Sequence, residues 1–387
     1  MRLSKTRAGI IAGFSRKPSV FADQNDSRSA CAFAGGVFNC ALPRSDALSL
    51  SKKIRLLRAY VSGKPVFCTW QVTYACNFRC RFCDYWKEEV NYNPAARARE
   101  ATLKDIRLAS EKLATIGSLV ISVAGGEPLL RRDIAEITAA LAERHFPLMT
   151  TNGWLVTEER ARELWDAGLC GISVSLDYGK GSTRADGTEQ HDLQRGMPGA
   201  AERARRAIQI LSRTRTHHRQ QVNLICVLND RNLRDVEELA KFAAENDATF
   251  SVQPYCSFKH GRQTLGSISQ ASQALIALKK RCANFRSTMR FLSNFDRFHG
   301  GSGIAGCKAG QAFFNIDNLL NVQKCVEFRE EPVGNLRALT PEQVLVRLRT
   351  EHQRNSCTAC WYSCRGEVES LYTVAGFLSA LPTLFEH

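Results

Sequence analysis

The sequence predicts an α/β fold, a partial (β/α)6 TIM-like barrel followed by a small cysteine-rich C-terminal domain. The first observation is that short apolar runs alternate with helical patterns from Val66 to about Gln253, as in parallel strands joined by crossover helices. The second is that glycine-rich and polar motifs follow these runs, at the positions where barrel loops converge on one face. Six such units fit a barrel or partial barrel better than a short open sheet.

Each apolar run predicts one strand, and the segments between the runs predict helices. The expected strands are 66–73, 118–124, 147–151, 171–176, 221–228 and 248–253. The expected helices are 102–115, 130–143, 158–167, 199–212 and 233–245, where apolar residues recur at three- and four-residue steps. These elements place a barrel core in residues 60–285 and the C-terminal domain in residues 300–370.

The composition is that of an ordinary soluble protein, with 44% hydrophobic and 24% charged residues in a chain of 387. Apolar stretches such as 119–124 are far shorter than the roughly 18 residues of a membrane span, so none is expected. Fifteen cysteines in so long a chain indicate thiolate-bound metal in a reducing, cytoplasmic setting better than a secreted disulfide scaffold.

The N-terminal arm, residues 1–48, contributes part of the net charge of +15. Residues 1–60 hold eleven Lys or Arg against three Asp, and no helical or strand pattern begins before about Leu48. The arm is expected to be a disordered extension or sequence upstream of the true translation start, with a transit peptide as the third interpretation. The basic bias is therefore partly a property of the N-terminal segment, and no nucleic-acid partner is expected.

Three cysteines with the spacing Cys76-x3-Cys80-x2-Cys83 follow the first predicted strand directly. Three thiolates on one loop can each ligate one iron of a cubane cluster, which leaves the fourth iron open. A zinc knuckle is the alternative, but structural zinc needs four ligands and no further Cys or His lies nearby in the sequence. The spacing therefore predicts an iron-sulfur cluster with one open site.

The cysteine segment, CNFRCRFC with an aromatic residue before the third cysteine, resembles the signature of the radical S-adenosylmethionine (SAM) superfamily. The resemblance implies that Cys76, Cys80 and Cys83 are the cluster ligands and that Phe82 packs against the adenine of SAM. It also implies a radical SAM barrel in which the reduced cluster splits SAM and a 5′-deoxyadenosyl radical abstracts a substrate hydrogen.

The segment Gly125-Gly126-Glu127-Pro128 follows the second predicted strand and resembles the GGEP element of the same superfamily. The resemblance implies that this strand end and the Glu127 carboxylate meet the methionine ammonium of SAM. A cationic amine in a dry site needs such an acceptor, and glycine permits close approach of the backbone. Without the cysteine triad, a plain glycine turn would be the default interpretation.

Two further positions resemble SAM contacts in related enzymes such as the molybdenum cofactor GTP cyclases. Ser175, at the end of the fourth predicted strand, is similar to a serine that contacts the ribose and carboxylate of SAM. Pro254 and Tyr255 follow the sixth strand, where that group makes a backbone contact to adenine. Asn152 and Asp177 also end strands, but residues of these types form turn caps without any ligand.

The C-terminal region carries Cys307-x17-Cys325 and then Cys357-x2-Cys360-x3-Cys364. It resembles the SPASM and twitch auxiliary domains, in which two cysteines flank a hairpin and a later C-x2-C closes the site. The resemblance assigns the first four of these cysteines to a second [4Fe-4S] cluster, with Cys364 as a substitute for one of the last two. A zinc ribbon built from the same cysteines remains the alternative, because thiolate spacing does not separate zinc from iron.

The stretch HDLQRG, residues 191–196, resembles a segment common in peptide-modifying relatives. A charged turn at a helix start explains it as simply, so its residues are not assigned to the site.

The combined motifs, from Val66 to Cys364, predict a radical SAM enzyme that acts on a peptide or a small metabolite. A reductant such as flavodoxin or ferredoxin is the expected partner. The alternative is a non-catalytic iron-sulfur protein that binds SAM or carries electrons. An intact GGEP element beside the cysteine triad argues against this alternative, because an electron carrier needs no ligand pocket.

Overall fold

A computed structural model describes residues 46–256, 268 and 270–373 of the chain. Almost all of the predicted N-terminal arm therefore lies outside the described residues. The three residues of the arm that are described, 46–48, already belong to the first helix, α1 (Asp46–Val61).

Six parallel strands lie side by side in the order in which the chain forms them. They are β1 (Phe67–Thr73), β2 (Val120–Gly125), β3 (Phe146–Thr151), β4 (Gly171–Ser175), β5 (Gln221–Leu228) and β6 (Thr249–Pro254). Each coincides with a predicted strand to within two residues at either end. The α/β fold with a parallel sheet predicted from the apolar runs is confirmed.

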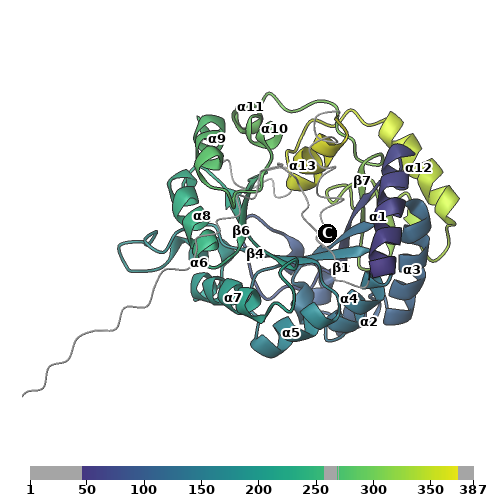
Figure 1. Ribbon diagram of the computed structural model, residues 1–387, viewed down its shortest axis with the longest axis horizontal. Coiled ribbons are helices and arrows are strands. Elements are labelled where there is room, and N and C mark those ends of the chain that lie inside the picture. The colour runs from purple at the N-terminus through teal and green to yellow at the C-terminus, as the bar shows by residue number, and fades with distance from the viewer. Residues whose placement is uncertain (1–45, 257–267, 269, 374–387) are drawn as a thin grey trace, which may run out of the picture. The chain divides into compact units, whose positions relative to one another are not determined.

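The helices between successive strands pack along the outside of the sheet (Figure 1). They include α3 (Leu103–Ile116), α4 (Ile134–Ala142), α5 (Glu158–Asp166), α7 (Ala200–Thr214) and α8 (Val236–Glu245). Helix α3 begins at a capping box, in which the Thr102 hydroxyl accepts from the Asp105 amide while the Asp105 carboxylate accepts from the Thr102 amide. It ends at Gly117, whose φ of 105° suits glycine.

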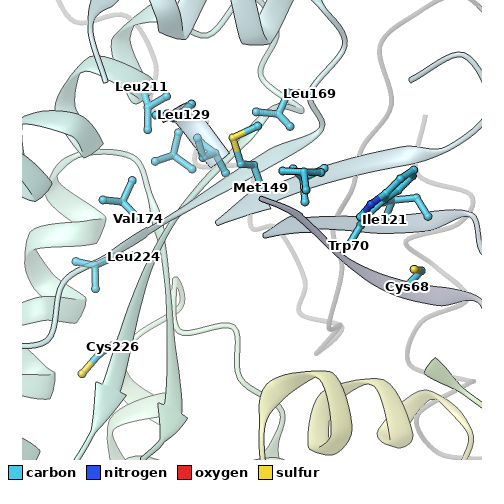
Figure 2. Close-up of a cluster of buried hydrophobic side chains, with 14 of the residues drawn as sticks. Cys68, Trp70, Ile121, Leu129, Met149, Leu169, Val174, Leu211, Leu224 and Cys226 are labelled. Carbon is cyan, nitrogen blue, oxygen red and sulfur yellow. The ribbon is translucent and has the colours of Figure 1, made fainter. Parts of the chain in front are cut away.

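The strands carry two different faces because side chains alternate along a strand. On β1, Cys68, Trp70 and Val72 belong to the hydrophobic core, whereas Thr69 and Gln71 line a cavity on the opposite face. Figure 2 shows the outward core residues of several strands together with residues of the surrounding loops and helices. The helices therefore cover an apolar face, and the inner face is left for a polar site.

The C-terminal region adds to the same sheet. Strand β7 (Phe313–Ile316) pairs in parallel with β1, from Phe67 beside Phe313 to Trp70 beside Ile316. Strands β8 (Asn321–Gln323) and β9 (Gly334–Asn335) follow in antiparallel order. The hairpin expected between the first two tail cysteines is thus present as β7–β8, and it extends the barrel sheet instead of forming a sheet of its own.

Helix α13 (Ser363–Leu371) lies between the two sides of the barrel sheet (Figure 1). It contacts β7, and the Ser363 hydroxyl donates to the side-chain oxygen of Gln253 on β6 at 3.0 Å. Helix α13 therefore fills the gap that the open sheet leaves between β6 and β7.

Short elements complete the described chain. They are η1 (Tyr85–Lys87), η2 (Glu89–Asn91), α2 (Pro94–Ala98), η3 (Pro128–Leu130), α6 (Gln190–Arg195), η4 (Leu233–Asp235), α9 (Ala271–Arg281), α10 (Met289–Leu292), α11 (Phe295–His299) and α12 (Pro341–Gln353). None of the helices in the described residues has the length and apolarity that a membrane crossing requires.

Candidate functional site

The three cysteines of the first motif lie in the loop after β1, at the carboxyl end of the strand. Cys76, Cys80 and Cys83 all line one cavity of about 420 Å³. Cys80 is buried and the other two are half-buried. The sequence motif therefore lies where the polar inner face of the sheet meets the loops, as predicted for a barrel.

Two asparagines hold the cysteine loop in place. The Asn91 side-chain oxygen accepts from the Cys76 amide at 2.8 Å, and its amide group donates to the carbonyls of Tyr74 and Tyr85. On the other side, the Asn152 amide group donates to the side chain of Asn77 at 2.8 Å. The loop is thus attached both to the segment that follows it and to the end of β3.

Helix α6 supplies a further attachment from a distant part of the chain. The amides of Arg79 and Arg81 donate to the carbonyls of Arg195 and Gln194, at 3.2 and 2.9 Å. Gly196 follows with φ of 63°, and a Cβ built there would lie 2.4 Å from the Arg79 carbonyl oxygen. The HDLQRG stretch, which the sequence left unassigned, is therefore part of the support of the cysteine loop.

The two glycines at the end of β2 are required by the neighbouring backbone. A Cβ on Gly125 would lie 2.0 Å from the Thr73 carbonyl oxygen, and one on Gly126 would lie 2.1 Å from that of Ala75. The Gly126 amide also donates to the Thr73 carbonyl at 2.9 Å. Both glycines line the cavity, so the close approach brings bare backbone to the cavity wall beside the cysteine loop.

Glu127 is fully buried and is not among the residues that line the cavity. Its carboxylate accepts from the Thr151 hydroxyl at 2.8 Å, the Asn152 amide at 2.7 Å and the Leu129 amide at 3.0 Å. Burial raises the pKa of Glu127 to about 7, although these donors favour the ionised form. Glu127 therefore joins the ends of β2 and β3, and its predicted contact with SAM stays a prediction.

Two residues that are predicted to contact adenine, Phe82 and Tyr255, lie next to each other. Phe82 lines the cavity, and the Tyr255 ring meets it edge-on with 6.3 Å between ring centroids. The Arg195 guanidinium lies over the Phe82 ring, 4.9 Å from the ring centroid. Ser175, at the end of β4, also lines the cavity. Phe82 and Tyr255 are thus neighbours in space and Ser175 borders the same cavity as Phe82. Their contacts with SAM stay predictions.

A buried ion pair lies next to the Phe82 ring. The Arg195 guanidinium donates to both carboxylate oxygens of Asp177, at 2.7 and 2.9 Å, and Asp177 is fully buried. Burial opposes ionisation, yet the Arg195 charge holds the pKa of Asp177 well below its usual range. His191 accepts from the Asp177 amide at 3.1 Å, and burial lowers its pKa. Asp177 is therefore an ion-pair partner and not a turn cap.

The donor set around the cavity fits a cluster with one open iron. Burial raises the pKa of the Cys76 and Cys80 thiols. The positive charge of a bound metal would lower these pKa values again. Within the described residues no three Cys, His, Asp or Glu side chains are grouped to hold a single metal ion. A cubane presents a different iron to each thiolate, so three thiols spread around one cavity suit it better than they suit one ion.

All five tail cysteines border a second, small cavity of about 20 Å³. Cys307 precedes β7, Cys325 follows β8, and the other three lie between α12 and the first turn of α13. Burial raises the pKa of Cys307 and raises that of Cys325 to about 12. The finding that no three such side chains in the described residues are grouped to hold a single ion applies to these thiols too. The thiolate donors by themselves suit iron-sulfur and zinc alike.

Three residues line both cavities, namely Val326, Tyr362 and Cys364. Tyr362 is buried, and its hydroxyl has a side-chain interaction with Cys256. The sequence analysis assigns Cys364 only as a substitute ligand of the auxiliary cluster. Its position in the first turn of α13 places this thiol at the boundary between the two sites.

The model of the radical SAM superfamily matches residues 70–243, which cover β1 to most of α8. This range contains the cysteine loop, the two glycines and the Asp177–Arg195 pair. Residues 70–243 form a radical SAM domain. The predicted superfamily is thereby supported for residues 70–243, and nothing in this match extends to β6 or to the tail.

Curated relatives resemble parts of the chain. The Fe-coproporphyrin III synthase of Methanosarcina barkeri is 32% identical over 202 residues, which cover 50% of this chain and 45% of the relative. The GTP 3′,8-cyclase of Tolumonas auensis is 39% identical over 109 residues, or 27% of this chain and 31% of the relative. The chain thus spans less than half the length of these relatives. Their names support the prediction that a protein with this radical SAM domain is an enzyme.

Solved structures support the fold. SuiB of Streptococcus suis matches with a TM-score of 0.57 and 15% identity, over 84% of this chain and 79% of that chain. The structure of SuiB bound to S-adenosylmethionine matches with a TM-score of 0.56 and 17% identity, over 72% of this chain and 65% of that chain. At such identities the likeness concerns the fold alone, which is the mixed α/β architecture around the radical SAM domain.

Proposed function

We propose that this chain is a radical SAM enzyme that reductively cleaves SAM and abstracts hydrogen from a peptide or small-metabolite substrate in the barrel cavity. The single observation that carries the proposal is the convergence of Cys76, Cys80 and Cys83 with Gly125 and Gly126 on one cavity. A bound [4Fe-4S] cluster would supply the open iron and the electron for SAM cleavage.

The chain itself would position the cofactor. The bare backbone at Gly126 and the hydroxyl of Ser175 offer polar contacts at the cavity wall, and the Phe82 ring offers an apolar face beside Tyr255. Glu127 would hold the β2 and β3 loops in register for these contacts through its three hydrogen bonds. A reductant such as flavodoxin or ferredoxin would deliver the electron.

The tail thiols support a second part of the proposal. We assign Cys307, Cys325, Cys357 and Cys360 to an auxiliary [4Fe-4S] site of the SPASM or twitch kind, because all four border one small cavity. Cys364 borders the same cavity and is a candidate to replace one of them. A structural zinc ribbon is the competing assignment for these residues.

The second candidate function is a non-catalytic iron-sulfur protein that binds SAM or transfers electrons. The cavity that the cysteine loop borders disfavours an electron carrier, because electron transfer alone needs no internal space of about 420 Å³. A SAM-binding protein without chemistry would still fit this cavity, so the deciding measurement is product formation.

The experiment tests SAM cleavage in anaerobically reconstituted protein with dithionite. The parent chain should release 5′-deoxyadenosine, and Cys80→Ala should release none because the cluster loses one of three thiolates. Cys282→Ala is the matched control, since Cys282 is half-buried but lines neither cavity. Equal release from the parent and Cys80→Ala would refute the assignment, and binding of SAM without release would favour the non-catalytic candidate.

A further inference from the structure

The inner face of the barrel carries many neutral polar side chains among apolar ones. The hydroxyl and amide side chains there are Thr69, Gln71, Ser122, Thr150, Ser173, Gln221, Asn223, Thr249, Ser251 and Ser287. Within the described lining, the charged groups are Arg195, Arg286 and Glu367. These hydroxyl and amide groups can bind polar groups of a substrate, and the charged side chains decide which charge the substrate carries.

Arg286 is held beside β6 by backbone hydrogen bonds. The Arg286 amide donates to the Phe250 carbonyl at 2.7 Å, and the Phe250 amide donates to the Asn284 carbonyl at 2.8 Å. Phe250 lies four residues before the end of β6 at Pro254. At about 3.3 Å per residue, the backbone of Arg286 lies roughly 13 Å along the strand from the carboxyl end of β6.

The Arg286 side chain has no partner among the residues that the structure describes. Its Nε atom is buried without a hydrogen bond, and the guanidinium lines the cavity. Arg195 differs, because both carboxylate oxygens of Asp177 neutralise it. Arg286 is half-buried, and a polar atom that is buried without a partner is costly. A cation kept at a cavity wall without a described counterion therefore indicates an anionic ligand.

The neighbouring charged groups are already engaged. Glu367 accepts from the Thr288 amide at 3.1 Å and from the Thr288 hydroxyl at 2.7 Å, and burial raises its pKa to about 7. Lys279 donates to the Phe285 carbonyl at 2.8 Å. Glu367 forms no described ion pair with Arg286, and Lys279 is itself a cation. Neither group therefore neutralises the Arg286 guanidinium.

We propose that Arg286 binds a carboxylate group of the substrate, so that the substrate class is a polar molecule with a free carboxylate. The planar guanidinium can hold the two oxygens of a carboxylate through paired hydrogen bonds, and one cation balances one negative charge. The surrounding hydroxyls and amides would bind the neutral remainder. This inference rests on the proposed function, because it assigns the substrate of the same cavity.

The test uses N-trifluoroacetylglycine and its neutral amide as ¹⁹F NMR probes of the reconstituted full chain. The parent should bind the acid more tightly than the amide. Arg286→Gln should weaken binding of the acid about tenfold or more, as expected for a lost charge-assisted hydrogen bond, and should leave the amide unchanged. Arg286→Lys, which keeps the charge but not the planar pair of donors, should bind with intermediate affinity.

Arg234→Gln is the matched control, because its side chain is 80% exposed and does not line the cavity; it should bind the acid as the parent does. The proposal is overturned if the parent shows no preference for the acid, or if Arg286→Gln binds the acid as well as the parent. Tighter competition by inorganic phosphate than by acetate would overturn the carboxylate assignment in favour of a phosphate.

SAM itself carries a carboxylate, so SAM binding by Arg286→Gln is measured separately. A loss of SAM binding would overturn the proposal and assign Arg286 to the cofactor. Release of 5′-deoxyadenosine by the parent is measured in the same preparation. Absence of that product refutes the proposed function, whereas its presence with an unchanged Arg286→Gln refutes only the substrate assignment.

Discussion

The two thiol sites of this chain are built in different ways. The barrel site takes Cys76, Cys80 and Cys83 from a single loop after β1 and borders a cavity of about 420 Å³. The tail site collects cysteines from before β7, from after β8 and from the loop that leads into α13, and borders a cavity of about 20 Å³. The first site is local in sequence with space for ligands, and the second is assembled across 58 residues, from Cys307 to Cys364, with almost no free space.

This difference shows which contacts hold each of the two thiol sites in place. The barrel loop is positioned by hydrogen bonds from α6 and from the end of β3, so other elements of the barrel fix its place. The tail thiols depend on the docking of α13 against β7 and β6. We therefore expect the two sites to respond differently to the same kind of damage.

The largest expected effect is the loss of one site without the other. Replacing Cys76, Cys80 and Cys83 together by Ala should abolish release of 5′-deoxyadenosine while about four irons remain, against about eight in the parent, because the tail draws no ligand from the loop. Iron, sulfide and zinc analysis after anaerobic reconstitution measures this. About four irons in the parent, none in the variant and one zinc in both would instead establish a zinc ribbon.

The next effect concerns the support behind the barrel site. Asp177→Asn removes the partner of buried Arg195 and should lower the free energy of unfolding by about 3–5 kcal/mol, since an uncompensated charge stays buried. The exposed pair of Arg162 and Glu158 provides the control, and Arg162→Gln should cost at most about 0.5 kcal/mol. Chemical denaturation of both variants gives the comparison, and equal small losses would show that the buried pair does not support the loop.

A smaller, pH-dependent effect distinguishes Glu127. Because its pKa in the folded chain is about 7, above its ordinary value of 4.5, the folded state binds more protons between these two values. Its contribution to stability is therefore present at low pH, is lost as the pH rises toward about 7, and is constant above that. Glu127→Gln should remove this slope, which amounts to about 3 kcal/mol at most. Denaturation at pH 5 and pH 8 measures it, and parallel profiles for parent and variant would contradict the assignment.

The smallest expected effect is that of the N-terminal arm. A chain that begins at Asp46, the first residue of α1, should fold and release 5′-deoxyadenosine at the parent rate, since the composition of the arm offers no apolar face for packing. Thermal unfolding should shift by less than about 2 °C for so small a change in free energy. Loss of soluble protein on this truncation would show that the arm is structural.

The sequence predicted the barrel strands well because their signal is local. A run of apolar residues after a helical pattern is visible within about ten residues, and all six strands lie within two residues of their predicted ends. The same holds for the cysteine loop and the glycines of β2, which follow their strands directly. The HDLQRG stretch was left unassigned because its partner, the Arg79 loop, lies more than 100 residues earlier in the chain.

The sequence by itself determined the six parallel strands β1 to β6 and the place of the cysteine triad and the two glycines at the strand ends. The hairpin between Cys307 and Cys325 followed from the resemblance to the SPASM and twitch domains. Only the tertiary structure decided that β7 joins the barrel sheet beside β1, that Cys364 faces both cavities and that Arg286 has no counterion in the described chain. The physical reason is that strand and turn patterns depend on neighbouring residues, whereas pairing, burial and charge compensation depend on segments that meet only after packing.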